Sequence, residues 1–431
     1  MARRTNTGLN RRDLMKTGAV VGAGYWLATE VRESKAANEK LNVACIGIGG
    51  RGGANVNGVR SQNIVALCDV DDQRAGKQYE RFPNAKKFYD HREMFDAMEK
   101  QIDAVTVSTP DHAHFHPSMM ALERGIHLYC EKPMAHNVWQ VRRMTEKANE
   151  KKLATQLGNQ RHAKSNMRRI VELIQAKAIG DVTEVHSWIG GSRGMPADPK
   201  DFPPVPSHLK WDLWLSQAPE RKYSPAYCPY NWRFWWDFGT GETGNWGCHI
   251  LDIPFWALDL KYPTKVAASG PEVEPEKTPK SMTTEFDFPA SGSRPACKLH
   301  WYHTSSPEIL KKHNLSGRGA NTVFIGTEGI LVCGFDSRKL YPEDKFKDYK
   351  PPAESIAPSP GFHNEWIQAC KGGAAATCNF DYTGPMAETV LLGNVAYRAG
   401  GFQWDSKTLT AKDNDKAAQF IREEVRKGWE I

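Results

Sequence analysis

A glycine-rich turn between two buried strands is the feature that most constrains the fold of this chain. Residues 41–48 form a continuous apolar run, which is typical of a strand buried on both faces of a parallel sheet. The run leads into residues 47–52, which read Gly-Ile-Gly-Gly-Arg-Gly, a complete G-x-G-x-x-G pattern. After a helix-length interval, a second apolar run over residues 64–68 ends at Asp69. This order of strand, glycine turn, helix and strand predicts an open α/β sheet.

The same stretch predicts a dinucleotide site. Glycines permit a tight turn and a close approach of the backbone, and the start of the following helix faces the pyrophosphate. Asp69 stands twenty residues after Gly49, where a carboxylate accepts the adenosine ribose hydroxyls. Because a carboxylate repels a 2′-phosphate, NAD is favoured over NADP, although Arg74 nearby keeps NADP possible. The predicted cofactor-binding residues of the loop are Gly47, Gly49, Gly50, Arg51 and Gly52.

Two more motifs follow predicted strands. The strand over residues 104–108 leads into residues 109–114, which read Thr-Pro-Asp-His-Ala-His, and the strand over residues 126–130 leads into Glu-Lys-Pro at residues 131–133. Open α/β sheets bind ligands at the carboxyl ends of their strands, so both motifs are expected beside the cofactor. The predicted cofactor-binding members are Thr109, Pro110, His114, Glu131 and Lys132.

The glycine loop and these two motifs, in this order and spacing, resemble the family of glucose-fructose oxidoreductase, inositol dehydrogenase and MocA. Residues 158–161 (Gly-Asn-Gln-Arg) and 326–329 (Gly-Thr-Glu-Gly) extend the resemblance, which runs from about residue 41 nearly to the C-terminus. The resemblance implies a Rossmann domain over residues 37–158. It also implies a second α/β domain over residues 159–431, whose open, mostly antiparallel sheet carries substrate and oligomer contacts. The predicted strands there are 182–189, 282–288, 296–303 and 321–333.

By the same resemblance, the chain transfers hydride between NAD(P) and a sugar, polyol or glycoside, and forms a homo-oligomer, a dimer or tetramer. Oxidation of a secondary alcohol requires a base for the hydroxyl proton. Lys132 is implied to bind the reacting oxygen and relay its proton, and His249 to act as general base, with Asp252 one turn away. Asn245 stands where many members carry aspartate. Asparagine can orient a hydroxyl but cannot take its proton, so the transfer falls to His249 and Lys132.

Tryptophan gathers in one segment of the second domain. Seven of the fourteen tryptophans lie between residues 211 and 256. Aromatic faces bind the C–H faces of sugar rings, so this segment is a candidate substrate wall, with core or oligomer packing as the alternative for more than half of the rings. The candidate substrate-binding residues are Arg161, His162, Trp235, Trp236, Trp246, Asp252 and Tyr302, with His300 beside Tyr302 as a weaker one.

The cysteines and histidines predict neither a metal site nor a disulfide framework. The nine cysteines show no Cys-x-x-Cys spacing, and most lie in apolar runs, where a free cysteine behaves as a small hydrophobe. Histidines at 112, 114 and 116 lie on a strand-to-helix turn and are expected to point in divergent directions. We interpret His114 as packing beside the nicotinamide, and His112 and His116 as surface residues.

Residues 1–36 resemble a twin-arginine export signal. Residues 10–16 read Asn-Arg-Arg-Asp-Leu-Met-Lys, followed by a weakly apolar stretch over 17–28 and by Ser-Lys-Ala at 34–36. This segment holds seven basic and three acidic residues, which supply +4 of the formal charge of +7. We therefore expect a periplasmic or otherwise exported protein without a nucleic-acid partner. No apolar run approaches the ~18 residues of a membrane-spanning helix, so no stable membrane insertion of the mature chain is expected.

Three functions remain open from the sequence. The first is a dehydrogenase, or a transhydrogenating oxidoreductase, acting on a sugar. The second is a redox-neutral enzyme that oxidises a glycoside transiently, cleaves or epimerises it and returns the hydride. The third is a non-catalytic sugar-binding protein, which the pairing of Lys132 with His249 disfavours. An exported enzyme has no supply of free nicotinamide cofactor, so we expect the cofactor to be bound tightly and reset within the enzyme.

Overall fold

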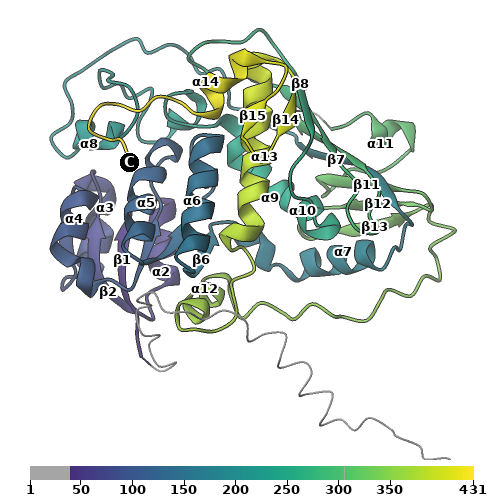
Figure 1. Cartoon of the computed structure of the whole chain (residues 1–431), viewed down its shortest axis with the longest axis horizontal. Helices are drawn as coiled ribbons and strands as arrows, with labels where there is room; N and C mark the ends of the chain where they lie inside the picture. Colours follow the sequence, from purple (N-terminus) through teal and green to yellow (C-terminus); the bar gives the residue numbers. More distant parts are fainter. Residues whose placement is uncertain (1–38, 305) are drawn as a thin grey trace, which may run out of the picture. The chain divides into compact units, whose positions relative to one another are not determined.

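The computed structural model describes residues 39–304 and 306–431, and the predicted signal over residues 1–36 lies outside them (Figure 1). The amino-terminal part holds a six-stranded sheet of order β3-β2-β1-β4-β5-β6, in which all pairs are parallel. Its strands are β1 (Asn42–Ile46), β2 (Asn63–Cys68), β3 (Lys86–Phe88), β4 (Ala104–Val107), β5 (His127–Cys130) and β6 (Thr155–Leu157). Its helices are α2 (Arg51–Gly58), α3 (Asp72–Arg81), α4 (His91–Met98), α5 (Phe115–Glu123) and α6 (Val138–Glu150).

This sheet is the predicted Rossmann arrangement, which the structure confirms. The central strands are short and apolar, and every residue of β4 is buried, because helices cover both faces. The strand order reverses between β1 and β4, and in such sheets a crevice forms at the carboxyl ends of the two strands where the order reverses. The glycine loop, which follows β1, and the Thr-Pro motif, which follows β4, both lie there.

The second sheet has nine strands in the order β13-β12-β11-β7-β10-β9-β8-β14-β15. Only β7 and β10 pair in parallel among its described neighbours, which confirms the expected open, mostly antiparallel sheet. Its strands are β7 (Val182–Ile189), β8 (Lys265–Ser269), β9 (Met282–Phe288), β10 (Cys297–His303), β11 (Thr322–Gly326), β12 (Ile330–Cys333), β13 (Arg338–Tyr341), β14 (Phe402–Asp405) and β15 (Thr410–Ala411). The remaining helices are α7 (Ser165–Gln175), α8 (Trp211–Leu215), α9 (Cys248–Ile250), α10 (Asp252–Leu258), α11 (Ile309–Lys312), α12 (Phe362–Cys370), α13 (Phe380–Ala399) and α14 (Ala418–Ile421).

Helix α13 joins the two sheets. It contacts α6 of the Rossmann part as well as strands β8 and β9, and Figure 1 shows it between them. Arg142 on α6 donates two hydrogen bonds to the buried Glu388 carboxylate on α13, at 2.7 and 2.8 Å. The two parts are therefore held together by a buried helix as well as by the chain connection.

The described part of the chain also bears on the cysteines and on membrane-spanning helices. All nine cysteines are free and buried, as expected for small apolar side chains in the core. None of the helices within residues 39–304 and 306–431 is long and apolar enough to cross a membrane.

Candidate active site

A cavity of about 780 Å³ opens at the carboxyl edge of the six-stranded sheet. Its walls include the glycine loop, Asp69, Glu131 and Lys132, and residues of the second domain such as Asn245 and His249. The volume lies within the range of small-molecule and cofactor sites, which is roughly 300 to 1,000 Å³. The structure thus brings most of the residues predicted from separate motifs to one place.

The glycine loop closes only because two of its members lack a side chain. A Cβ added to Gly52 would lie 1.7 Å from the carbonyl oxygen of Gly47. Gly47 itself has a φ of +72°, and a Cβ there would lie 2.7 Å from the carbonyl carbon of Ser108. Helix α2 begins at Arg51, directly after this turn. The backbone therefore forms a cradle at the start of a helix, which fits the pyrophosphate of a dinucleotide.

Asp69 fixes this cradle to the end of β2. Its Oδ2 accepts hydrogen bonds from the amides of Ile48 (2.7 Å) and Gly49 (3.1 Å), and its Oδ1 accepts one from Asp71 (3.0 Å). Burial raises the pKa of Asp69, whereas these backbone donors oppose the change. The Asp69 carboxylate lines the cavity, and it can accept a further hydrogen bond in addition to these three. It can therefore still make the predicted contact with a ribose hydroxyl.

Arg74 on α3 lies over the loop. A Cβ added to Gly50 would lie 2.7 Å from Nη2 of Arg74, and one added to Gly49 would lie 2.8 Å from its Cβ. Both Arg74 and Asp69 line the cavity, so a cation and an anion stand at the part that would receive the adenosine ribose. A 2′-phosphate bound at this part would lie between these two opposite charges.

Glu131 is a buried anchor that joins three segments. Its Oε1 accepts hydrogen bonds from Arg51 Nε (3.1 Å), Asn55 Nδ2 (2.9 Å) and Gln160 Nε2 (2.8 Å). The pKa of Glu131 is lowered. Burial alone would raise it, but the positive charges of Arg51 and Lys132 and the hydrogen bond from Asn55 have the larger effect. The carboxylate is therefore ionised at neutral pH and ties α2 to the end of β5. It lines the cavity, as do Thr109 and Pro110.

His114 lies beside the cavity without lining it. One ring nitrogen lies 2.8 Å from the carbonyl oxygen of Pro133 and the other 2.8 Å from that of Thr109. The ring therefore links the Thr-Pro turn to the Glu-Lys-Pro turn. The packing of this ring beside the nicotinamide stays a prediction.

His112 and His116 correct a prediction, since neither is a surface residue. The nitrogens of His112 lie 3.1 Å from the carbonyl oxygen of Phe238 and 2.9 Å from that of Trp214. His116 pairs with His91 at 2.8 Å. The aromatic segment of the second domain covers His112, and the three rings point to separate surroundings, as expected for this turn.

Lys132 connects the Rossmann part to the second domain. Its Nζ donates hydrogen bonds to the backbone carbonyl (2.8 Å) and to the Oδ1 (3.0 Å) of Asn245. The pKa of Lys132 is lowered, because the effect of burial exceeds the opposing effect of the negative charges of Asp111 and Glu131. Asn245 lies in a π-helical turn (Thr243–Gly247), which precedes α9. The predicted catalytic lysine and the asparagine that replaces aspartate are therefore direct partners.

Glu242 adds a carboxylate that the sequence analysis missed. Asn245 Nδ2 donates to its Oε2 at 3.0 Å, and Arg193 donates to both of its oxygens at 2.6 and 2.9 Å. The pKa of Glu242 is lowered: burial alone would raise it, but the hydrogen bonds from Arg193 and Asn245 have the larger effect. A polar row thus runs from Lys132 through Asn245 and Glu242 to Arg193, which also lines the cavity. The available signal was the spacing of three residues between Glu242 and Asn245.

His249 has a defined tautomer. Its Nδ1 is hydrogen-bonded to Oδ1 of Asn159, and the amide nitrogen of Asn159 donates to the carbonyl of Cys248 at 3.0 Å. This network assigns the amide oxygen as the acceptor, so Nδ1 carries the proton and Nε2 is free to accept one. Burial lowers the pKa of His249 well below its ordinary value, and the cations Lys132 and Arg161 lower it further. The ring is neutral at pH 7, the form required of a general base.

Other cavity residues escaped the sequence analysis. Asp111 accepts hydrogen bonds from the amide (3.1 Å) and the hydroxyl (2.6 Å) of Thr240. Arg233 places its guanidinium 4.1 Å from the centroid of Trp232. Asp111 stood inside the Thr-Pro motif and could have been included, whereas no sequence pattern marked Arg233.

The predicted substrate wall is only partly present. Trp246 and Arg161 line the cavity, and the Arg161 guanidinium lies 5.5 Å from the Trp246 ring centroid. Trp235 and Trp236 are corrections: they are 1% and 4% exposed, and their indole nitrogens donate to the backbone carbonyls of residues 226 and 274. They support the core, while Trp214 and Trp232 line the cavity in their place.

Three further candidates lie outside the cavity. The Nδ1 of His162 lies 3.0 Å from both carboxylate oxygens of Asp252, and its ring stacks on Trp256 at 3.9 Å. Tyr382 also donates to Asp252, so this pair forms a buried structural network. Tyr302 bonds His186 on the second sheet, at 2.9 Å. These placements replace the predicted substrate contacts of His162, Asp252 and Tyr302.

Comparison with known proteins assigns both parts of the chain. Residues 17–159 match the Gfo/Idh/MocA oxidoreductase family, NAD-binding Rossmann fold, and residues 185–289 match the C-terminal alpha/beta domain of the same family. Inositol 2-dehydrogenase of Arthrobacter sp. (strain FB24) is 28% identical over 155 residues, or 34% of this chain and 45% of that protein. D-glucoside 3-dehydrogenase of Escherichia coli (strain K12) is 36% identical over 85 residues, or 20% of this chain and 24% of that protein. The chain thus spans less than half the length of these curated relatives.

Solved structures share the whole architecture. The WlbA dehydrogenase from Bordetella pertussis, in complex with NADH and UDP-GlcNAcA, superimposes with a TM-score of 0.60 at 14% identity, covering 85% of this chain and 99% of that one. The inositol dehydrogenase homologue from Azotobacter vinelandii, complexed with NADH and myo-inositol, gives a TM-score of 0.53 at 15% identity, covering 83% and 95%. At these identities the likeness establishes the fold.

Proposed function

The chain belongs to the Gfo/Idh/MocA family of NAD-binding oxidoreductases, and we propose that it oxidises a secondary hydroxyl of a sugar, polyol or glycoside. One observation carries the proposal. Lys132, Asn245 and His249 meet in the same cavity as a glycine cradle that fits a dinucleotide. NAD, when bound, accepts the hydride of the substrate carbon.

The residues beside the reacting carbon have complementary roles. A lysine ammonium has three donors, and Lys132 uses two on Asn245, which leaves one for the substrate oxygen. This positive charge stabilises the negative charge that develops on that oxygen. The neutral His249 takes the hydroxyl proton at Nε2 while the C–H bond gives up its hydride, and a carbonyl group forms.

The polar row favours a polyhydroxy substrate. Asn245 and Arg193 supply polar groups from one side of the cavity, the buried Glu242 holds both of them, and Trp246 adds an aromatic surface. Sugars present hydroxyl edges and C–H faces, which match these two kinds of surface. The names of the relatives, an inositol and a glucoside dehydrogenase, agree with this substrate class.

NAD is the proposed cofactor. The Asp69 carboxylate lines the cavity at the end of β2, where a 2′-phosphate would meet a negative charge. Arg74 supplies a compensating cation, so the preference is one of degree.

The test combines binding with turnover. Calorimetry of the purified chain with NAD and NADP should show micromolar or tighter binding of NAD. Absorbance of NADH, followed with a panel of inositols, glycosides and keto-sugars, should then identify at least one substrate. A protein that binds neither dinucleotide, or binds NAD but transfers hydride to or from none of these compounds, would contradict the proposal.

We further propose that the chain is exported and resets its cofactor within each catalytic cycle. This rests on the twin-arginine pattern over residues 1–36, because that route carries folded proteins. The holoenzyme, freed of unbound cofactor, should convert sugar over many turnovers without added NAD. Conversion between two sugars would indicate transhydrogenation, and conversion of one glycoside would indicate a redox-neutral reaction. Strict dependence on added NAD with stoichiometric NADH release would identify an ordinary dehydrogenase.

A further inference from the structure

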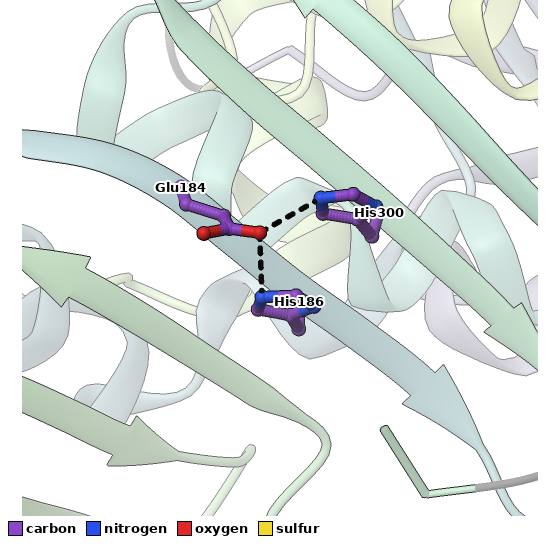
Figure 2. A group of neighbouring side chains, drawn as sticks. All are labelled: Glu184, His186 and His300. Atoms are coloured by element: carbon purple, nitrogen blue, oxygen red, sulfur yellow. Dashed lines mark hydrogen bonds and ion pairs between the residues drawn. The ribbon is translucent and has the colours of Figure 1, made fainter. Parts of the chain in front are cut away.

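A second cluster of polar side chains lies on the nine-stranded sheet. Figure 2 shows Glu184 and His186 on β7 facing His300 on the neighbouring strand β10. The two strands are parallel, and His300 is in register with His186. Because side chains alternate along a strand, Glu184 and His186 project from the same face as His300.

This face is opposite to the main hydrophobic core, and it also carries a small buried apolar cluster that includes Trp188 and Val323. The intervening residues Val185, Leu299 and Trp301 are fully buried, and the Trp301 indole donates to Thr243 in the turn that carries Asn245. Glu184, His186 and His300 are absent from the described lining of the active-site cavity. The cluster is therefore separate from the hydride-transfer site.

The distances suit a shared ion. Oε1 of Glu184 lies 3.1 Å from Nε2 of His300 and 3.2 Å from Nε2 of His186. Ligand atoms bound tetrahedrally to zinc at about 2.0 to 2.1 Å stand about 3.3 Å apart. One ligand atom from each of the three residues lies within 4.8 Å of the others, and because the two imidazole rings stack with an interplanar angle of 6°, both rings must turn for their nitrogens to face one ion.

One nitrogen of the cluster lacks a hydrogen bond. His186 is 5% exposed, and its Nε2 has no hydrogen-bond partner among the described residues, although the Glu184 carboxylate stands beside it. A buried nitrogen lone pair or N–H without a partner is unfavourable. Coordination to a cation would satisfy this nitrogen.

The outer nitrogen of His186 is held by a hydrogen bond, and the outer nitrogen of His300 faces a carboxylate beyond hydrogen-bond distance. Nδ1 of His186 is 2.9 Å from the Tyr302 hydroxyl, and Nδ1 of His300 is 3.6 Å from Oε2 of Glu285. Histidines that bind metals commonly have their second nitrogen fixed in this way, which orients the ring. The neighbouring ammonium of Lys298 is paired with Glu285 and with Asp287, so its charge is balanced close to the cluster.

We propose that Glu184, His186 and His300 bind a divalent transition-metal ion, with a water molecule as a further ligand. Two imidazoles and one carboxylate are a ligand set typical of zinc. Sequence spacing could not indicate it, because Glu184 and His300 lie 116 residues apart and meet only through the pairing of β7 and β10. The proposal goes beyond the oxidoreductase function and does not depend on it.

Metal binding can be measured directly on the untagged chain after treatment with EDTA. Calorimetry with Zn²⁺ and absorption spectroscopy with Co²⁺ should show one ion per chain, with the visible bands of tetrahedral Co²⁺. His300→Gln and Glu184→Gln should each weaken binding at least about 100-fold, and Tyr302→Phe about 10-fold. His208→Gln, which removes a part-exposed histidine paired with Asp71, is the matched control and should bind like the native chain.

Folding is checked independently. Glu184 is partly exposed, so Glu184→Gln should retain native circular dichroism and NAD affinity. Zn²⁺ should raise the Tm of the native chain and of His208→Gln, but not that of Glu184→Gln, because an ion stabilises only the state that binds it. Absence of stoichiometric binding by the folded native chain, or equal binding by Glu184→Gln and His300→Gln, would overturn the proposal.

Discussion

The active-site cavity has two parts, one formed by the backbone of the glycine loop and the other by side chains around Lys132. The glycine-loop part consists of backbone drawn from residues 47–52 and fixed by Asp69, about twenty residues away. The Lys132 part consists of side chains from distant segments, where Lys132 meets Asn245 across 113 residues and His249 meets Asn159 across 90.

This difference separates shape from chemistry. The loop presents amides whose positions depend on the absence of side chains, so it responds to added volume. The Lys132 part presents a cation and a neutral imidazole whose protonation depends on burial and on neighbouring charges. Substitutions in the first part should therefore change cofactor affinity, and substitutions in the second should change turnover.

The largest effect is expected at Lys132 and His249. Lys132→Ala and His249→Ala should each lower kcat by about 10²- to 10⁴-fold, because each removes a group that handles charge or the proton in the transition state. NAD affinity, measured by calorimetry, should change by less than about threefold. Lys339→Met, which alters an exposed lysine, is the control. Unchanged turnover in either alanine variant would remove that residue from the mechanism.

In the glycine loop, a substitution is expected to change NAD affinity. Gly52→Ala should weaken NAD binding about 100-fold, equivalent to about 3 kcal/mol, because its Cβ would lie 1.7 Å from the Gly47 carbonyl oxygen. Gly76→Ala on α3 is the matched control, since nothing lies within 4 Å of the added Cβ. Fluorescence titration of NADH checks both variants. Tight binding by Gly52→Ala would show that the cradle can rearrange.

A smaller effect is expected at Asp69. Asp69→Asn keeps the shape of the side chain but removes the charge that opposes a 2′-phosphate. The ratio of NADP to NAD affinity should rise about tenfold, the size expected for one charge near the surface. An unchanged ratio would assign cofactor choice to Arg74, and Arg74→Gln would then be the variant to compare.

The smallest effect concerns pH. Since the pKa of His249 lies well below its ordinary value of 6.5, His249 remains an unprotonated base as pH falls to 6.5 and below. The acidic limb of kcat/KM for oxidation should therefore lie below pH 6.5. The alkaline limb should lie below pH 10.5, because burial lowers the pKa of Lys132 and the ammonium is lost earlier. An acidic limb above pH 6.5 would assign the base to another group.

The same difference determines what could be predicted from the sequence. The glycine loop and Asp69 were identifiable because their spacing is local and each residue type has a geometric reason. Asn245 and His249 lie four residues apart, the spacing of one helix face, but only the family resemblance brings Lys132 to them. Trp235 and Trp236 were misplaced because a tryptophan in a substrate wall and one in the core have the same local pattern. Glu242 contacts the site only through Asn245 and Arg193, and Arg193 lines the cavity from a loop without a motif, so both leave little trace in one sequence.

Strand β10 should tolerate substitutions but not insertions or deletions. Trp301 faces the turn beside the active site, and His300 faces the opposite side with Glu184 and His186. Insertion or deletion of a single residue within this strand would exchange the two faces, placing an imidazole in the core and an indole at the polar cluster. Variation in length should therefore be confined to the loops on either side of residues 297–303, while the strand itself varies only by substitution.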